Sequence, residues 1–295
     1  MAAHDFKQKI IEELTVLVTA SKGEPNGGFK SRAYVTAIKR LSELGPIYAE
    51  SDVPDLPGIG VKVRAKIAEI ITTGHLAAAD KGRQIEPALK AFGNIYGVGP
   101  KAAQDLVSQG FRTIDEIRAS TTVKLTKNQQ VGLRVYDDLL LRIPRAEMEE
   151  HQKLLSTGTI VGSFRRGQPT SGDIDVLLTE GLAETVTALT TLGYITDILA
   201  QGPSKCLAVC RLPGKPHRRL DFLLTPTEEL PFAILYFTGS DTFNVAMRQK
   251  ASDMGFRLNE HGLLHTKTNK YVTGIRTEKD IFTILKMDWK EPHER

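Results

Sequence analysis

Two aspartates, Asp173 and Asp175, stand one residue apart in the apolar run GDIDVLLT. Alternate side chains of an extended strand point to the same side, so both carboxylates are expected on one face. Neighbouring carboxylates repel each other, and a shared cation relieves that repulsion. Oxygen ligands without cysteine or histidine favour Mg²⁺ or Mn²⁺. The pair therefore indicates a divalent-metal site, with two exposed acids that cap a strand as the alternative.

A third carboxylate, Asp221, lies in the apolar run RRLDFLL. The short turn LPGKPH joins this run to CLAVCR, which also has the composition of a strand. Three carboxylates brought together on neighbouring strands suit phosphoryl transfer with two divalent ions.

The segment before the aspartates supplies groups that bind phosphate. Gly162 and Ser163 stand ten residues before the aspartate pair, with Arg165 and Arg166 in between. Backbone amides, a hydroxyl and two guanidiniums are the groups that hold a triphosphate. Their combination with Asp-x-Asp is a much stronger signal than either feature alone.

A short repeat in the first half of the chain has the pattern apolar-x-Gly-apolar-Gly-x-Lys. It occurs as LPGIGVK at 56–62 and as IYGVGPK at 95–101, each followed by a helical pattern. Two glycines around an apolar residue form a tight turn whose amides point outward at a helix start, where an anion binds. Against DNA, such a turn holds phosphates without reading bases. The repeat resembles the helix-hairpin-helix motif.

The elements that position these residues change in kind along the chain. Up to about residue 145, apolar residues recur at helical spacing, as in Phe6, Ile10, Leu14 and Leu17. Beyond about 158, β-rich runs appear at 159–161, 174–178, 206–211 and 220–224, with helical segments near 182–192 and 229–238. The pattern predicts an all-α first half and an α+β second half, joined near 139–150.

Composition sets wider limits. The 295 residues suggest about two domains, and no stretch approaches the ~18 apolar residues of a membrane helix. The N-terminal segment lacks the basic-then-apolar order of a signal peptide. The net charge of +4 is too small to indicate a polyanionic partner by itself. Cys206 and Cys210 lie too far apart on one strand for a disulfide, which favours two free thiols in a reducing compartment.

The string GSFRRG…SGDIDVLLT, followed by HRRLDF and YFTGSDTFN, resembles the family X DNA polymerases, with the polymerase beta type as the nearest match. The resemblance runs from about residue 6 to the final EPHER. It implies an N-terminal helix-hairpin-helix lyase domain and a mixed-sheet nucleotidyltransferase palm. The implied boundaries are 1–83 for the deoxyribose-phosphate lyase domain, 84–145 for a DNA-binding subdomain with the second hairpin, 146–226 for the palm and 227–295 for a nucleotide-selection subdomain.

The resemblance implies roles in the second half of the chain. Asp173, Asp175 and Asp221 would hold two Mg²⁺ or Mn²⁺ ions, and Asp221 would also help the primer 3′-hydroxyl lose its proton. Nucleotide contacts fall on Arg142, Gly162, Ser163, Arg166, Ser171, Gly172, Tyr236, Phe237, Gly239, Asp241 and Asn244. Arg219 and Arg248 match DNA contacts.

In the first half, the resemblance implies a lyase whose Lys66 forms a Schiff base with an abasic sugar. Lys30, Tyr34 and Lys62 match positions that hold the 5′-phosphate, and the hairpins add DNA contacts at Gly58, Gly60, Gly97, Gly99 and Lys101. Carbonyls of Leu56, Ile59, Ile95 and Val98 would hold a monovalent Na⁺ or K⁺. The helical pattern alone instead favours an ordinary surface lysine beside an apolar face at Lys66.

Several positions depart from the family pattern. Phe29, Ala78 and Pro54 or Asp55 replace a histidine and two lysines, which puts lyase efficiency and 5′-phosphate affinity in question. Leu223 replaces an arginine that holds a metal-binding aspartate in an inactive pairing, and His261 replaces a nearby tyrosine. We hypothesise that Leu223 lowers the barrier to activation. Val245 replaces a lysine that stacks on the template, so fidelity is expected to differ.

The sequence thus predicts a monomeric, template-directed polymerase that fills gaps or nicks in DNA from deoxynucleoside triphosphates, with a lyase, in base-excision repair. A nuclear or other intracellular DNA-containing compartment is expected, and no membrane. Alternatives are a template-independent terminal transferase, disfavoured by the short LPGKPH turn, a polymerase with a vestigial lyase domain, a binding protein with a dead site, and a nucleotidyltransferase acting on RNA or small molecules. No phosphoprotein-binding domain precedes residue 6, so family members that carry one are expected to be poorer guides.

Overall fold

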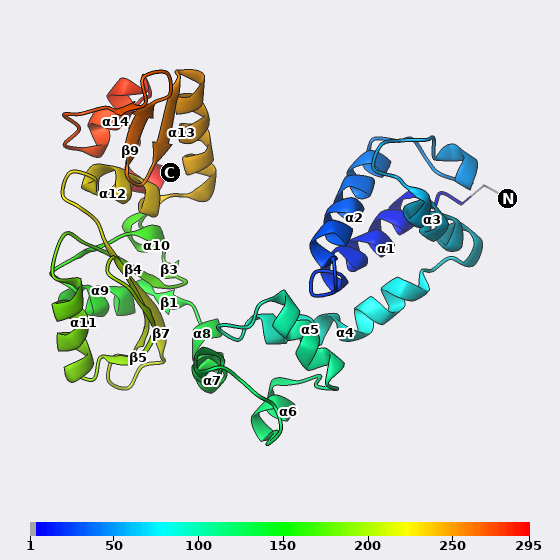
Figure 1. Ribbon diagram of the computed structural model, residues 1–295, viewed down its shortest axis with the longest axis horizontal. Helices are drawn as coiled ribbons and strands as arrows, with labels where there is room; N and C mark the ends of the chain where they lie inside the picture. The colour runs from blue at the N-terminus through cyan, green and yellow to red at the C-terminus, as the bar shows by residue number, and fades with distance from the viewer. Residues whose placement is uncertain (1–3) are drawn as a thin grey trace. The chain divides into compact units, whose positions relative to one another are not determined.

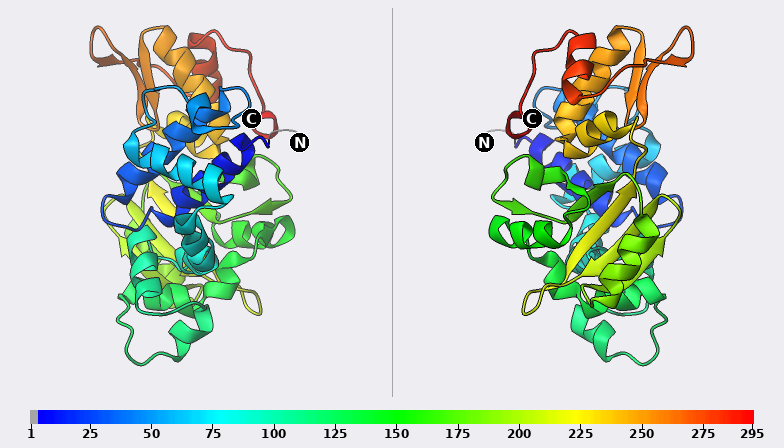
Figure 2. Two further views of the ribbon diagram at one scale, coloured as in Figure 1. Left: turned by 90° about the vertical axis from the view of Figure 1, so that its right-hand side faces the viewer. Right: turned by 90° about the vertical axis from the view of Figure 1, so that its left-hand side faces the viewer.

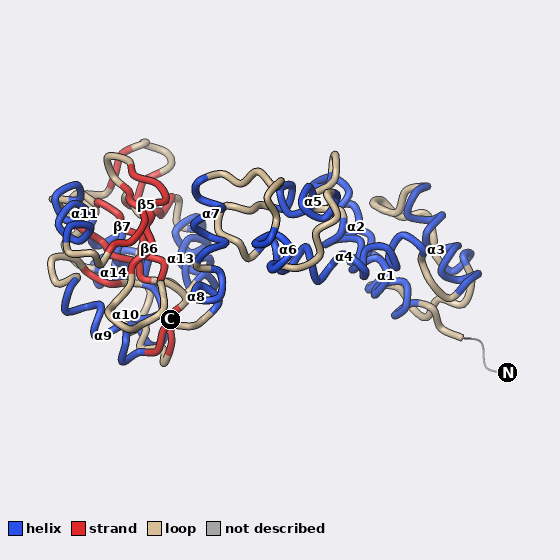
Figure 3. Tube along the Cα trace, turned by 90° about the horizontal axis from the view of Figure 1, so that it is seen from below, coloured by secondary structure: helices blue, strands red, loops and turns tan. Residues whose placement is uncertain are grey.

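A computed structural model describes residues 4–295. The chain divides into two compact units, with the division between Tyr136 and Asp137. Strands among the described residues occur only in the C-terminal unit (Figure 3). The predicted change from all-α to α+β is therefore confirmed. No helix in residues 4–295 is long and apolar enough to cross a membrane.

The N-terminal unit is a succession of helices (Figure 1). They are α1 (Lys7–Ala20), α2 (Gly27–Ser42), the 3₁₀ turn η1 (Glu50–Asp52), α3 (Val61–Thr73), α4 (Ala77–Gly93), α5 (Pro100–Ser108), α6 (Ile114–Ala119) and α7 (Lys127–Arg134). One apolar core joins α1, α2, α3 and the start of α4, and a second lies around Phe92 and Ile95. Helix α8 (Tyr136–Leu140) begins at the last residue of this unit.

A five-stranded sheet forms the centre of the C-terminal unit, in the order β2-β4-β7-β6-β5. Its strands are β2 (Thr159–Ile160), β4 (Ile174–Leu178), β5 (Ile195–Gln201), β6 (Lys205–Cys210) and β7 (Arg218–Leu224). Strands β4 and β7 run parallel and the other pairs antiparallel. The mixed sheet expected of the palm is thus present, with α9 (Arg145–Leu154) and α11 (Leu182–Thr191) packed on one of its faces (Figure 2).

Alternation along the strands decides which face each residue joins. Ile174, Val176 and Phe222 belong to the core beneath α9 and α11, together with the buried free thiols of Cys206 and Cys210. The intervening residues, which include Asp175 and Asp221, therefore point to the opposite face. The parity of the sequence pattern thus places both carboxylates away from the core.

A buried ion pair fixes the start of β7 to α9. Both side chains of the Arg218–Glu147 pair are about 95% buried, and Nε and Nη2 of Arg218 donate to the two carboxylate oxygens at 2.7 and 2.9 Å. The His151 Nδ1 and the Tyr194 hydroxyl lie 2.6 Å apart in the same core. Burial lowers the pKa of His151, which favours its neutral form.

The rest of the C-terminal unit surrounds a smaller sheet, β10-β9-β8. Its elements are β8 (Phe256–Asn259), β9 (Gly262–His265), β10 (Lys270–Tyr271), α12 (Leu230–Thr238), α13 (Asp241–Asp253), α14 (Glu278–Ile284) and η2 (Pro292–Glu294). The two-stranded pair β1 (Ile143–Pro144) and β3 (Thr170–Ser171) and the short helix α10 (Gly162–Arg165) complete the unit. Arg165 of α10 pairs with Glu278 of α14 at 2.6 Å, which ties the two parts together.

Candidate active site and DNA-binding surfaces

The three predicted carboxylates gather at the junction of β4 and β7. Asp175 and Asp221 are direct partners in the parallel register, and Asp173 immediately precedes β4. Nη2 of Arg219 lies 2.9 Å from Oδ2 of Asp221 and 3.7 Å from Oδ2 of Asp173. The structure therefore brings Asp173 and Asp221 to one guanidinium, with Asp175 opposite Asp221 in the sheet. Arg219, expected as a DNA contact, pairs with Asp173 and Asp221 in the protein alone.

The carboxylates are held in an environment that disfavours their charge. Burial, and then the charges of Asp173 and Asp221, raise the pKa of Asp175 to about 7. Burial likewise raises the pKa of Asp221, against the opposing effect of Arg219. A cation placed among these groups relieves both causes of the shift.

The donor set fits a divalent ion that a substrate completes. Oδ1 of Asp221 is buried without a hydrogen-bond partner among residues 4–295, and an unsatisfied buried oxygen of this kind is suited to a ligand. Among residues 4–295, no group of three or more His, Cys, Asp or Glu side chains is arranged to hold a metal ion by itself. Mg²⁺ commonly uses one or two carboxylates, with waters and substrate phosphates completing its shell. These carboxylate oxygens could therefore serve as ligands of a metal ion that substrate and water complete.

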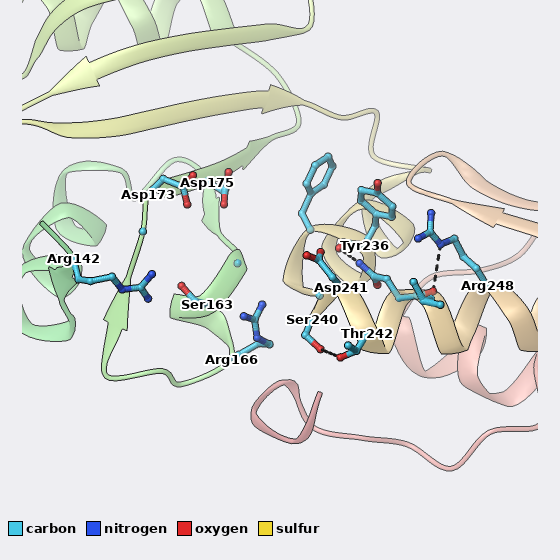
Figure 4. Close-up of a pocket in the computed structure, with 16 residues that line it drawn as sticks. Arg142, Ser163, Arg166, Asp173, Asp175, Tyr236, Ser240, Asp241, Thr242 and Arg248 are labelled. Carbon is cyan, nitrogen blue, oxygen red and sulfur yellow. Dashed lines mark hydrogen bonds between the residues drawn. The ribbon is translucent and has the colours of Figure 1, made fainter. Parts of the chain in front are cut away.

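A pocket of about 670 Å³ opens beside Asp173 and Asp175. Figure 4 shows Arg142, Ser163 and Arg166 with the two aspartates on one side and residues of α12 and α13 on the other. Its further lining residues are Gly162, Gly172, Tyr236, Phe237, Gly239, Ser240, Asp241, Thr242, Asn244, Val245 and Arg248. Of the predicted nucleotide-binding residues, only Ser171 is not in the lining.

Helix α10 forms the side of this pocket where the sequence predicts phosphate contacts. Gly162, the first residue of α10, has a φ of +63°, a conformation that L side chains rarely adopt. The Ser163 hydroxyl donates to the hydroxyl of Ser171 at 3.0 Å, and Ser171 is 1% exposed. Ser171 is therefore placed to support Ser163 and does not itself face the pocket. Two hydrogen bonds to Thr170 hold Arg142 on the same side of the pocket as Ser163 (Figure 4).

The junction of α12 and α13 forms the other side. Nδ2 of Asn244 donates to the Tyr236 carbonyl at 2.7 Å, and Nε of Arg248 donates to the Asn244 carbonyl at 3.3 Å. Arg166 Nη1 donates to the carbonyl of Thr238. The end of α12 is therefore bonded both to Asn244 of α13 and to Arg166, which directly follows α10. A flat, polar base and a sugar would face Tyr236 and Phe237 here.

The departures from the family pattern occupy three different settings. Leu223 packs against the buried cluster of Val161, Leu177 and Ala233, and it lies on the same side of β7 as Asp221. Val245 is 59% exposed in the pocket wall. Nδ1 of His261 lies 2.7 Å from Oε2 of Glu229, and this hydrogen bond raises the pKa of His261.

The two Gly-x-Gly repeats of the N-terminal unit have the same backbone. Gly58 and Gly97 have φ values of +98° and +82°, and Gly60 and Gly99 stand as N-caps of α3 and α5. The amide of Ile59 donates to Leu56 O, and the amide of Val98 donates to Ile95 O, both at 3.0 Å. These bonds leave the second lone pair of each carbonyl oxygen for a further ligand. Lys101 follows the second turn, as Lys62 follows the first.

The four predicted lyase residues meet in one pocket of about 380 Å³. Lys30 and Tyr34 come from α2, and Lys62 and Lys66 from α3. Lys66 is half-buried, beside the buried face of Val63 and Ile67. Burial raises the pKa of Tyr34, so its phenol stays neutral. The helical spacing that the sequence predicted for Lys62 and Lys66 is thus present.

One charged neighbour of the carboxylates was missed by the sequence reasoning. Lys205 is the first residue of β6, and its charge lowers the pKa values of both Asp175 and Asp221. A lysine at a strand start is a common surface feature, so only the pairing of β6 with β7 identifies it. Ser240 and Thr242 were likewise missed, although they lie inside the motif GSDTFN.

Family models match most of the chain in four consecutive parts. A helix-hairpin-helix domain matches residues 6–76, and the fingers domain of DNA polymerase lambda matches 90–140. The DNA polymerase beta palm matches 142–227, and the DNA polymerase beta thumb matches 233–295.

Individual relatives agree with these matches. The chain is 36% identical to DNA polymerase lambda of Rattus norvegicus, over 99% of this chain and 57% of that protein. It is 32% identical to DNA polymerase lambda of Arabidopsis thaliana, over 90% of this chain and 58% of that protein. A DNA nucleotidylexotransferase of Xenopus laevis is 29% identical, over 89% and 63%. The chain therefore spans less than two thirds of the length of each of these relatives.

Proposed function

The chain belongs to family X of the DNA polymerases, and we propose that it fills short gaps in duplex DNA by templated nucleotide addition. The observation that carries the proposal is the pairing of Asp175 with Asp221, with Asp173 alongside, at the edge of a pocket that contains arginines. The relatives named as DNA polymerases support the same activity. Base-excision repair, in an intracellular compartment that contains DNA, is the setting we propose.

The chain's own residues would bind and orient the reactants. Asp173, Asp175 and Asp221 would hold two Mg²⁺ or Mn²⁺ ions, and carbonyl oxygens of the hairpin turns a Na⁺ or K⁺. Two bound divalent ions neutralise phosphate charge and favour attack by the primer 3′-hydroxyl on the α-phosphorus, with pyrophosphate as the leaving group. Ser163 and Arg166 would hold the triphosphate, and Asp221 would accept the hydroxyl proton.

The other residues of the pocket would select the nucleotide and the template. Tyr236 and Phe237 would pack on the sugar, which disfavours a ribonucleotide. Asp241 and Asn244 would contact the incoming base. Arg248 would reach the template strand, and Arg219 would exchange its aspartate partners for primer phosphates when metal binds. This exchange is favourable because the divalent ions replace the guanidinium beside the carboxylates.

We infer a second activity, a 5′-deoxyribose-phosphate lyase, in the N-terminal unit. The amine of Lys66 would attack the sugar aldehyde and lose water to form an imine. Removal of a C2′ proton then breaks the C3′–O bond and releases the DNA 5′-phosphate, and water regenerates the lysine. The common pocket of Lys30, Lys62 and Lys66 supports this assignment.

One substrate tests both activities. A primer is extended across a one-nucleotide gap that carries a 5′ abasic phosphate, with wild type, Asp221→Ala and Lys66→Ala. Asp221→Ala should abolish extension and retain the borohydride-trapped adduct, and Lys66→Ala should do the reverse. Absence of any trapped adduct from wild type would leave only the polymerase.

The principal rival is template-independent transfer, the activity that the name of the Xenopus laevis relative denotes. The seven residues between β6 and β7 leave little chain to displace a template. Faster extension of single strands than of gapped duplex would favour this rival. Monomers in solution are expected, and light scattering on the DNA-free protein tests that point.

A further inference from the structure

The 380 Å³ pocket of the N-terminal unit has lining residues that no sequence motif indicates. Helix α4 contributes Lys81. Ser21, the C-cap residue directly after α1, contributes a hydroxyl. With Lys30, Lys62 and Lys66 this makes four lysines around one cavity. Glu24 is the single carboxylate in that lining, so the pocket has a cationic surplus.

The backbone of α4 fixes where Lys81 lies. A Cβ on the adjacent Gly82 would lie 2.9 Å from Val16 Cγ1 and 3.2 Å from Ala20 Cβ, so α4 meets α1 in close contact at this point. Arg83, the next residue, donates two bonds of 3.0 and 2.6 Å to the buried carboxylate of Glu13. The contacts of Gly82 and Arg83 with α1 therefore fix the backbone of α4 so that Lys81 lies at the pocket.

The hydroxyl of Ser21 is buried and has no internal partner. Ser21 is 5% exposed, and its Oγ makes no hydrogen bond within residues 4–295. Buried hydroxyls almost always have a partner, because the lost hydration is otherwise uncompensated. A ligand in the pocket would supply that partner.

The charges in the lining define the ligand. Glu24 already pairs with Lys30 at 2.7 Å, with both side chains more than 40% exposed, and an exposed pair of this kind is easily exchanged. Lys62, Lys66 and Lys81 have no carboxylate in the lining to pair with. A phosphate monoester carries about −1.5 to −2 charges and three acceptor oxygens, which suits several ammonium groups and one hydroxyl.

We propose that Lys81 and Ser21 bind the 5′-phosphate of a DNA strand end in this pocket. Lys81 donates to a phosphate oxygen, and the Ser21 hydroxyl gains in that ligand the partner that it lacks. The ligand is a strand end because Lys62, in the same lining, stands two residues after Gly60 of the turn that resembles a DNA-binding hairpin. The inference rests on the proposed function and adds two binding residues to it.

The test compares two gapped duplexes that differ only in a 5′-phosphate or a 5′-hydroxyl at the downstream strand. The full chain is titrated against each by fluorescence anisotropy, and the ratio of the two Kd values reports phosphate recognition alone. Lys81→Gln should reduce that ratio by about 3- to 10-fold. Ser21→Ala should reduce it by about 2- to 5-fold without lowering Tm, because the hydroxyl loses no internal partner.

Lys90→Gln is the matched control, since Lys90 is an exposed lysine on α4 outside this pocket. It removes the same charge and should leave the ratio unchanged. The double variant Lys81→Gln/Ala78→Lys places an ammonium group about one helical turn earlier in the same lining. It should recover part of the preference for the 5′-phosphate duplex. Competition by inorganic phosphate at equal potency would assign the site to free anions and overturn the strand-end proposal.

The outcomes separate this inference from the lyase activity. A wild-type preference for the phosphate that Lys81→Gln reduces no more than Lys90→Gln would overturn the role of Lys81, whatever the lyase result. An unchanged ratio of Kd values in Ser21→Ala would likewise overturn the proposed role of Ser21 in phosphate binding. A lowered ratio in both variants, with no borohydride adduct in wild type, would uphold phosphate binding and reject the lyase.

Discussion

Gly162 and Asp175 approach each other so closely that a Cβ on the glycine would lie 3.0 Å from Oδ2 of the aspartate. The glycine begins α10, which carries Ser163, and the aspartate lies within β4. The amide of Val161 donates to the Asp175 carbonyl at 3.0 Å and fixes the distance between the two elements. This close approach and this hydrogen bond therefore position the helix that we propose binds phosphate against the strand that we propose binds metal.

Gly162→Ala should impair catalysis by more than backbone strain explains. The φ of +63° makes alanine unfavourable by about 1–2 kcal/mol, and the new methyl group also displaces the Asp175 carboxylate. Gly193→Ala is the control, because Gly193 has a φ of +76° and no atom within 4 Å of its Cβ position. Both variants should lose similar stability in urea, but only Gly162→Ala should slow single-turnover extension, by about tenfold or more. Equal rates for the two variants would contradict the role of the contact.

The candidate site was predictable because its residues follow local rules. The alternation of GDIDVLLT places Asp173 and Asp175 on one face, and the glycine pattern places both hairpin turns. The parallel pairing that puts Asp221 opposite Asp175 depends on strand order, which no local pattern specifies. Lys81 and Ser21 reach their pocket only through the packing of α4 on α1, so their sequence context shows nothing unusual.

The strands that the sequence did not predict have weak local signals. Strand β5 lies at the sheet edge and contains two register shifts, which interrupt its alternation. Strands β8, β9 and β10 have only four, four and two residues. Contacts with α13 and α14 in a common core bury residues of β8 and β9 in a way that their short patterns do not reveal, and both residues of β10 are exposed. The predicted division into four subdomains remains a prediction.

Asp175→Asn should stabilise the metal-free protein, increasingly as pH rises. The pKa of Asp175 is raised from 3.8 to about 7, so ionisation of this acid lowers the free energy of unfolding as pH rises from about 4 through 7. Removing the charge should therefore add up to about 4 kcal/mol at pH 8 and clearly less at pH 5. Urea unfolding in EDTA at both pH values measures the difference, and an equal effect at both would disprove it.

Glu147→Gln should destabilise the C-terminal unit strongly, although Glu147 lies in α9, on the face of the sheet opposite Asp175 and Asp221. The change leaves the buried guanidinium of Arg218 without a counter-charge, at a cost of about 3 kcal/mol. The double variant Glu147→Leu/Arg218→Met removes both charges and should be more stable than Glu147→Gln. Urea midpoints give the ranking, and a double variant less stable than Glu147→Gln would show that the pair itself is strongly stabilising.

Leu223→Arg tests whether the leucine lowers the barrier to activation. Leu223 lies two residues beyond Asp221 on the same side of β7, so an arginine there could pair with a metal-binding aspartate and compete with the divalent ion. We expect single-turnover nucleotide addition to be slower by about 3- to 10-fold, and the Mg²⁺ concentration for half-maximal rate to be higher.

Leu223→Met keeps an apolar side chain against Val161, Leu177 and Ala233 and should change neither quantity. Leu223→Gln adds polarity without charge, so a Mg²⁺ shift as large in this variant as in Leu223→Arg would assign the effect to lost packing. Equal rates for wild type and Leu223→Arg would remove support for the hypothesis, because the aspartates would then be as accessible to metal with an arginine beside them as without one.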